Sequence, residues 1–143
     1  GETGKAILLK RAFAATVEEW LFAAEHIEQT GNKNIILCER GIRTFENTTR
    51  NTLDLNSVAL LKNQTQLPVF VDPSHGTGRK ELVEPLALAA AAVGADGLII
   101  ETHPNPDSSL SDKQQALSSA EFSSLMSKLE KLLKTFDRTL HTS

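Results

Sequence analysis

Three side chains in the second half of the sequence have the chemistry of metal ligands. His75, Glu101 and Asp112 offer one imidazole and two carboxylates, which are common donors for divalent cations. Each has an ordinary alternative, since His75 could cap a helix and Asp112 could be the N-cap of a short helix over residues 111–115. Glu101 has the stronger case, because a carboxylate that closes the apolar run 97–100 must be paired or coordinated if it is buried.

Three cations form a second group of candidates. Lys10 and Arg11 follow one apolar run of the sequence, and Arg40 follows the next. Ammonium and guanidinium groups bind phosphate and carboxylate oxygens, so we expect these three residues to bind a small, doubly anionic substrate. The alternative is that they form ion pairs with Glu39 or Glu101 at the same edge of the fold.

Four short apolar runs must position these residues. Each is too short and too continuous for an amphipathic helix and is typical of a buried parallel strand. The runs start about every 30 residues, which is the length of one strand and helix unit. Ligand sites of parallel α/β proteins lie beyond the carboxyl ends of the strands. The candidates that follow the four runs are therefore expected at one edge. The predicted strands are residues 6–9, 34–38, 68–71 and 97–100.

Helical patterns alternate with these runs. Thr16 with Glu19, and Ser118 with Glu121, have the spacing of capping boxes that begin the first and the last helix. Pro85 fits best in the first turn of an alanine-rich helix, where its missing N–H is tolerated. The predicted helices are residues 16–30, 56–64, 85–93 and 118–136, and residues 137–143 are expected to form a loose tail.

The order of elements predicts an α/β fold made of four strand and helix units. A complete eight-fold barrel needs about 250 residues, so the units would be half of one. A small open sheet is the other architecture that fits, and the periodicity does not choose between them.

Composition excludes several classes of protein. The 143 residues carry a net charge of -3 with both signs interspersed, so we expect no nucleic-acid partner and no binding to anionic lipid. The longest apolar stretch, residues 86–93, is far shorter than the roughly 20 residues of a membrane span. The single cysteine, Cys38, cannot form an internal disulfide, which favours a reducing compartment and a cytoplasmic location.

Five segments give the sequence a specific resemblance. They are LLKR (8–11), LCERGIRTF (37–45), TRNTLD (49–54), PVFVDPSH (68–75) and ETHP with LSD (101–112). In this order and spacing they resemble the 3-deoxy-7-phosphoheptulonate (DAHP) synthases, in the subfamily related to 3-deoxy-octulosonate 8-phosphate (KDO8P) synthase. The sister KDO8P synthases share the segments around residues 38–41 and 101–112, whereas the amino-acid sequence of residues 42–54 is similar to that of the DAHP branch.

The resemblance implies a fold and a site. It implies the C-terminal half of an aldolase class I-like TIM (β/α)8 barrel over residues 1–136. His75, Glu101 and Asp112 match the family's metal ligands, for manganese, iron, cobalt or zinc. Lys10 and Arg40 match its phosphoenolpyruvate contacts, and Lys10 and His75 are the expected catalytic residues. The family's cysteine ligand, its Lys-Pro-Arg-Thr-Ser motif and a further arginine are expected upstream of this sequence.

The resemblance also implies a reaction. Phosphoenolpyruvate condenses through its C3 carbon with the aldehyde of erythrose 4-phosphate, water adds at C2, and DAHP and phosphate are released. This transferase reaction is the first step of the shikimate pathway to aromatic amino acids. The alternatives are KDO8P synthase, with arabinose 5-phosphate as acceptor, and a non-catalytic half-barrel that binds a small anion or a partner chain.

Half a barrel has two unpaired sheet edges, so the sequence predicts that the chain associates. We expect a homo-oligomer, association with the missing N-terminal half, or misfolding when that half is not supplied. Size-exclusion chromatography with circular dichroism checks this expectation. A sharp monomer peak with native-like circular dichroism would contradict it.

Overall fold

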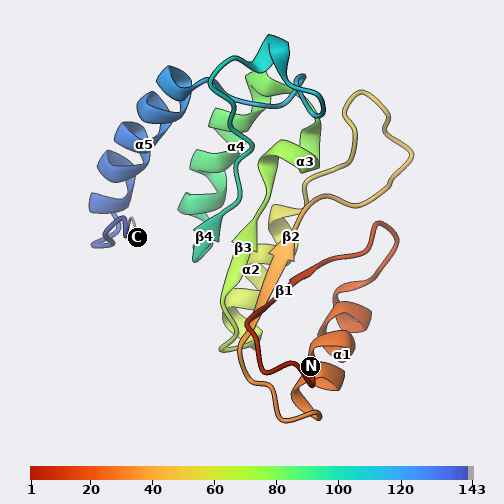
Figure 1. Ribbon diagram of the computed structural model, residues 1–143. Helices are drawn as coiled ribbons and strands as arrows, with labels where there is room; N and C mark the ends of the chain where they lie inside the picture. Colours follow the sequence, from red (N-terminus) through yellow and green to blue (C-terminus); the bar gives the residue numbers. More distant parts are fainter. Residues whose placement is uncertain (142–143) are drawn as a thin grey trace.

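A computed structural model of the protein describes residues 1–141. Its centre is a four-stranded parallel sheet in the order β1-β2-β3-β4, so that each strand pairs with the next one in the chain (Figure 1). All four predicted strands are present, with β4 shorter than expected. The strands are β1 (Ile7–Lys10), β2 (Ile35–Glu39), β3 (Val69–Val71) and β4 (Gly97–Leu98).

Helices connect the strands and follow the last one. Both predicted capping boxes are formed, by Thr16 with Glu19 and by Ser118 with Glu121, and they begin α1 and α5. No helix among residues 1–141 is long and apolar enough to cross a membrane. The helices are α1 (Val17–Glu28), α2 (Leu55–Gln64), α3 (Pro73–Thr77), α4 (Lys80–Ala92), the 3-10 helix η1 (Pro106–Ser108) and α5 (Ser119–Lys134).

The prediction for the alanine-rich helix was wrong at its start. Helix α4 begins at Lys80, so Pro85 lies inside the helix rather than in its first turn. A proline there removes one main-chain hydrogen bond, which destabilises a helix interior. Burial offsets this loss, because Val83 and Ala87, on either side of the exposed Pro85, are both fully buried.

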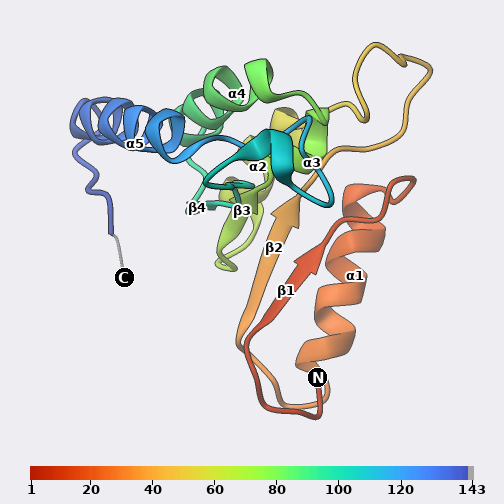
Figure 2. The same cartoon turned by 45° about the horizontal axis from the view of Figure 1, so that its top comes forward.

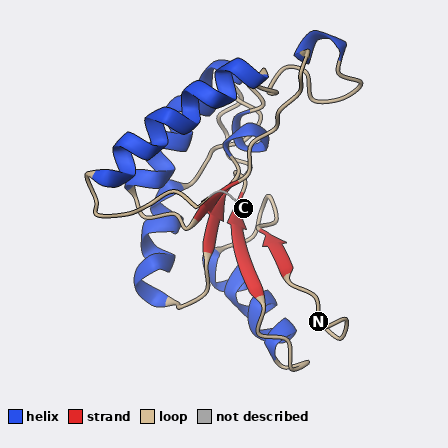
Figure 3. Ribbon diagram, turned by 60° about the vertical axis from the view of Figure 1, so that its left-hand side comes forward, coloured by secondary structure: helices blue, strands red, loops and turns tan. Residues whose placement is uncertain are grey.

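One face of the sheet holds the main core. The side chains that alternate along β2 and β3, among them Leu37 and Val69, pack with Trp20 of α1, Leu61 of α2 and Ala90 of α4. The three helices therefore cover the same face, and Figures 2 and 3 show helices and sheet from two further directions. A doubly wound sheet has helices on both faces, so this arrangement is the one that a barrel uses.

The segment after α5 returns to the body of the protein. Helix α5 packs on α4 through a second core cluster, and Leu140 contacts that cluster. Arg138 donates hydrogen bonds to the carbonyl oxygens of Ala91, at 3.0 Å, and Ala95, at 2.5 Å. Residues 138–140 are thus attached rather than loose, and residues 142–143 of the predicted tail lie outside the described chain.

A buried ion cluster joins β1, β2 and the start of α2. Arg11 is only 5% exposed, and its Nη1 lies 3.1 Å from Glu39 Oε2 and 2.9 Å from Asp54 Oδ2. The same nitrogen donates to Ser57 Oγ, and Nε donates to the carbonyl oxygen of Ala15. Burial raises the pKa of the Glu39 carboxyl, and the hydrogen bond from Arg11 opposes that rise. The guanidinium therefore favours the charged form of a fully buried carboxylate, against the effect of burial.

Replacing Arg11 by methionine should destabilise the fold strongly. The change Arg11→Met leaves Glu39 buried without its cation, which costs about 3–5 kcal/mol. Buried Trp20, the only tryptophan, lies 5.8 Å from Arg11 and reports unfolding in urea by its fluorescence. Because the pKa of Glu39 is raised in the folded chain, the loss should be largest at neutral pH and shrink as acid protonates the carboxyl.

The exposed Arg43 provides the control. The change Arg43→Met should alter the free energy of unfolding by no more than about 0.5 kcal/mol. Equal urea midpoints for the two variants would refute a structural role for Arg11.

Candidate metal and anion site

The site begins with Asp72, the residue that follows β3. Asp72 caps the short helix α3, with Oδ1 accepting the main-chain N–H of His75 at 2.9 Å, and Pro73 occupies the first helical position. Aspartate followed by proline is a preferred start of a helix. The cap fixes α3 at the carboxyl end of the strand and thereby places His75 at that edge of the sheet.

The same carboxylate orients the imidazole ring. His75 Nδ1 lies 2.9 Å from Asp72 Oδ2, and Asp72 is fully buried. A carboxylate at Nδ1 favours the tautomer with its proton on that nitrogen, which leaves the lone pair on Nε2. Nε2 lies 3.5 Å from Glu101 Oε2. The ring therefore presents its free nitrogen to the carboxylate of the next strand end.

The three predicted metal ligands come together. One ligand atom each from His75, Glu101 and Asp112 lies within 4.8 Å of the others, and all three residues are partly buried. Glu101 is fixed by its main-chain N–H, which donates to the buried Ser74 Oγ at 3.0 Å. One imidazole nitrogen and two carboxylate oxygens are a donor set that suits a first-row divalent cation. The residues present therefore fit a metal ion.

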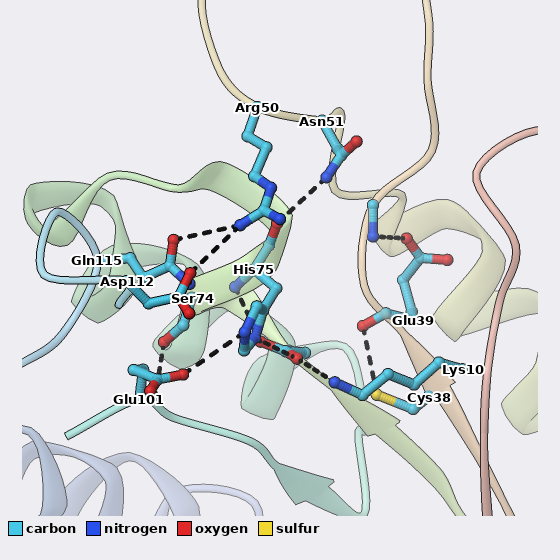
Figure 4. A network of polar contacts seen from close by, with 12 residues as sticks. Lys10, Cys38, Glu39, Arg50, Asn51, Ser74, His75, Glu101, Asp112 and Gln115 are labelled. Carbon is cyan, nitrogen blue, oxygen red and sulfur yellow. Dashed lines mark hydrogen bonds and ion pairs between the residues drawn. The ribbon is translucent and has the colours of Figure 1, made fainter. Parts of the chain in front are cut away.

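Asp112 is held by a neighbouring glutamine and by an arginine far away in the sequence. Its Oδ1 accepts a hydrogen bond from Gln115 Nε2 at 3.0 Å and lies 3.6 Å from Arg50 Nη1. Residues 111–115 contain a turn, at 113–115, rather than a helix, and Asp112 has a φ of 54°, so it is no helix N-cap. Two side chains thus direct the carboxylate toward the other ligands, as Figure 4 shows.

The loop that carries Arg50 is also bonded to α3. The main-chain N–H groups of Arg50 and Asn51 donate to the carbonyl oxygens of Thr77 and Gly76, both at 3.0 Å. The amide of Asn51 donates to the carbonyl oxygen of His75 at 3.2 Å. Ile42 and Thr52 pair across the base of this loop. Three successive carbonyls of the histidine-bearing helix are thereby tied to one loop.

Lys10 reaches the site from the end of β1. Its Nζ lies 3.1 Å from Asp72 Oδ2, and its side chain is 40% exposed. Lys10 and His75 therefore share one buried carboxylate. The alternative pairing that the sequence left open, with Glu39 or Glu101, is not the one that Lys10 makes.

Arg40 is a cation that lies against an aromatic ring. Its guanidinium carbon lies 4.0 Å from the centre of the Phe13 ring, and its buried Nε has no hydrogen-bond partner among residues 1–141. Burial, followed by the nearby charge of Arg50, lowers the pKa of Arg40. An anion at this position would satisfy the free donor and relieve the repulsion between the two arginines.

Arg11 does not belong to this group. We expected it to bind substrate, but its Nη1 is bonded to Glu39, Asp54 and Ser57 within the core. The physical reason is its direction, because neighbouring residues of a strand point to opposite faces. Lys10 faces the site, so Arg11 faces the helices, and its partner is the Glu39 that the sequence offered as an alternative.

Sequence reasoning missed some of the residues that shape the site. Asp72 had a signal, since it precedes a proline and stands three residues before His75, which is the spacing of a helix cap. Arg50 and Gln115 had none, because only the folded chain brings their loops together.

Comparisons with known proteins place the chain in a family. The profile of the DAHP synthetase I family matches residues 1–136. A phospho-2-dehydro-3-deoxyheptonate aldolase of Thermotoga maritima is 52% identical over 132 residues, which are 92% of this chain and 39% of that protein. A 2-dehydro-3-deoxyphosphooctonate aldolase of Methylococcus capsulatus is 35% identical, over 99% of this chain and 51% of its own length. The chain thus spans about half or less of these relatives.

Solved structures agree with the sequence matches. The crystal structure of the Thermotoga maritima DAHP synthase superimposes with a TM-score of 0.96 and 48% identity, covering 98% of this chain and 41% of that one. A truncated form of the synthase from the same organism gives a TM-score of 0.95 at 49% identity, covering 96% and 53%. The chain therefore belongs to the DAHP synthetase I family.

Proposed function

We propose that this chain forms the catalytic half of a DAHP synthase, which condenses phosphoenolpyruvate with erythrose 4-phosphate. The observation that carries the proposal is the convergence of His75, Glu101 and Asp112 within 4.8 Å. Lys10 and Arg40, whose Nε has no partner within residues 1–141, lie at neighbouring strand ends. A cation site beside an anion site suits a reaction between a carbonyl compound and an enol phosphate.

We further propose that residues 1–136 are the C-terminal half of a (β/α)8 barrel. The strands follow one another in sequential order, and the helices of the main core cover one face of the sheet. The opposite face carries partly exposed apolar side chains, such as Leu8 and Phe70, which a closed barrel would bury. Four further strands, supplied by the upstream half, would pair with the free edges of β1 and β4.

His75, Glu101 and Asp112 would hold a divalent metal ion. Such an ion polarises a bound carbonyl oxygen. The protein's own contribution is to fix the ligands, because Asp72 holds the imidazole with Nε2 free, Ser74 anchors Glu101, and Gln115 bonds Asp112. The three ligands would then need little rearrangement when the ion binds.

Lys10 and Arg40 would hold phosphoenolpyruvate. Lys10 is bonded to the fully buried Asp72, so its ammonium has a fixed position and two remaining donors. Arg40 adds a planar guanidinium with its Nε unpaired among the described residues. Together these cations would turn C3 of the enol phosphate toward the aldehyde, where the new carbon–carbon bond forms, and water would add at C2.

A second candidate function differs from the first in its acceptor sugar. The Methylococcus relative named for the octonate reaction matches almost the whole chain, although at lower identity than the Thermotoga protein. Arabinose 5-phosphate is therefore the rival acceptor. The higher identity favours erythrose 4-phosphate.

Metal binding is the first test. The changes Glu101→Gln and Asp112→Asn should each weaken the binding of Mn²⁺ or Zn²⁺ at least about tenfold, because each removes one charged ligand. Isothermal titration calorimetry measures this directly. Asp107→Asn, in an exposed acid of η1, is the matched control and should bind as the unsubstituted chain does. Equal affinities for all of these proteins would rule out the proposed ligand set.

Activity is the second test. A chimera in which this chain replaces the corresponding part of the Thermotoga maritima synthase should release phosphate from phosphoenolpyruvate and erythrose 4-phosphate, and much less with arabinose 5-phosphate. Lys10→Met should lower kcat/KM by a factor of roughly a hundred or more, since it removes a cation that orients the substrate. Preference for arabinose 5-phosphate would replace the proposal by the octonate reaction.

A further inference from the structure

We infer that Phe13 is a positioning residue for Arg40, and that its ring presents the guanidinium to the enol phosphate. The inference rests on the proposed function, because it takes Arg40 to be an anion-binding group. Phe13 lies in the turn between β1 and α1, where the sequence had singled out only Arg11 as a substrate-binding residue.

The ring is held in place by main-chain bonding. The carbonyl oxygen of Phe13 accepts the N–H of Arg43 at 2.8 Å, which ties the turn after β1 to the loop after β2. The ring centre lies 4.0 Å from the guanidinium carbon of Arg40. The phenylalanine is 37% exposed, so it lies at the surface where a ligand would arrive.

Stacking leaves the donors of an arginine free, whereas an ion pair uses them. Arg11 illustrates the second case, because acids, a hydroxyl and a carbonyl oxygen occupy its guanidinium. Arg40 illustrates the first, since its guanidinium carbon lies 4.0 Å from the ring centre, and a contact with a ring uses none of its N–H groups. The buried Nε of Arg40 has no partner among residues 1–141. Phe13 thus fixes the cation without neutralising it.

The neighbourhood of the ring favours an anion. Arg43 lies over the same ring, with its guanidinium carbon 5.4 Å from the centre. Arg50 is close enough for its charge to lower the pKa of Arg40. Two guanidiniums thus lie near the Phe13 ring, and a third, that of Arg50, acts on Arg40. A doubly charged phosphate or carboxylate ligand is the chemistry that relieves this arrangement.

The experiment compares substitutions of the ring in the chimera. Phe13→Leu keeps an apolar side chain and removes the aromatic face, and Phe13→Tyr keeps the face. Phe45→Leu is the matched control, because that ring is fully exposed in the next loop. The affinity for phosphoenolpyruvate is measured by calorimetry without the acceptor, together with KM for both substrates, kcat and the thermal midpoint.

Phe13→Leu should weaken phosphoenolpyruvate binding roughly tenfold and raise its KM to match, with kcat, the KM of the acceptor and the thermal midpoint unchanged. Phe13→Tyr and Phe45→Leu should stay within about twofold of the unsubstituted protein. A Phe13→Leu affinity within twofold of the parent, a tyrosine that fails to restore binding, or a loss that follows a lowered midpoint would each overturn the inference. If the parent itself does not bind phosphoenolpyruvate, the proposed function fails as well.

Discussion

The carboxylate of Asp72 is the constraint on which the site depends. A charge that is fully buried must be matched by donors, and this one is matched by residues of the proposed site. It accepts the main-chain N–H that begins α3, the Nδ1 of His75 and the ammonium of Lys10. One buried anion thereby sets the start of a helix, the tautomer of an imidazole and the position of a cation. The hydrogen bonds from these three donors offset the free-energy cost of removing the Asp72 carboxylate from water.

The alternation of side chains along the strands divides the cations into two roles. Lys10 pairs in register with Cys38, so the residues that follow them, Arg11 and Glu39, point to the opposite face and meet there. Arg40 comes one residue later and returns to the face of Lys10. The period of two thus separates a buried structural ion pair from the cations that remain available for binding.

Much of the fold could be predicted because its signals are local. Apolar runs mark the four strands, and the capping boxes at Thr16 and Ser118 fix where two helices begin. Pro85 misled the prediction, since tertiary burial of Val83 and Ala87 outweighs a local preference that sequence alone reports. The convergence of His75, Glu101 and Asp112 was predictable from strand ends and family segments. The contact of Arg50 with Asp112 was not predictable, because a contact between two loops has no periodic pattern in the sequence.

The loop between Ile42 and Thr52 has a consequence for how the sequence can change. Its base is closed by the pairing of those two residues, and its far end, residues 43–48, is exposed. Insertions at the exposed tip should be absorbed there, as surface turns generally allow. A single residue added between Arg50 and Thr52 would shift the hydrogen bonds between this loop and α3 by one residue. The imidazole of His75, which α3 carries, would then be displaced. The length of the loop is therefore constrained near its base, where it bonds to α3, and unconstrained at its exposed tip.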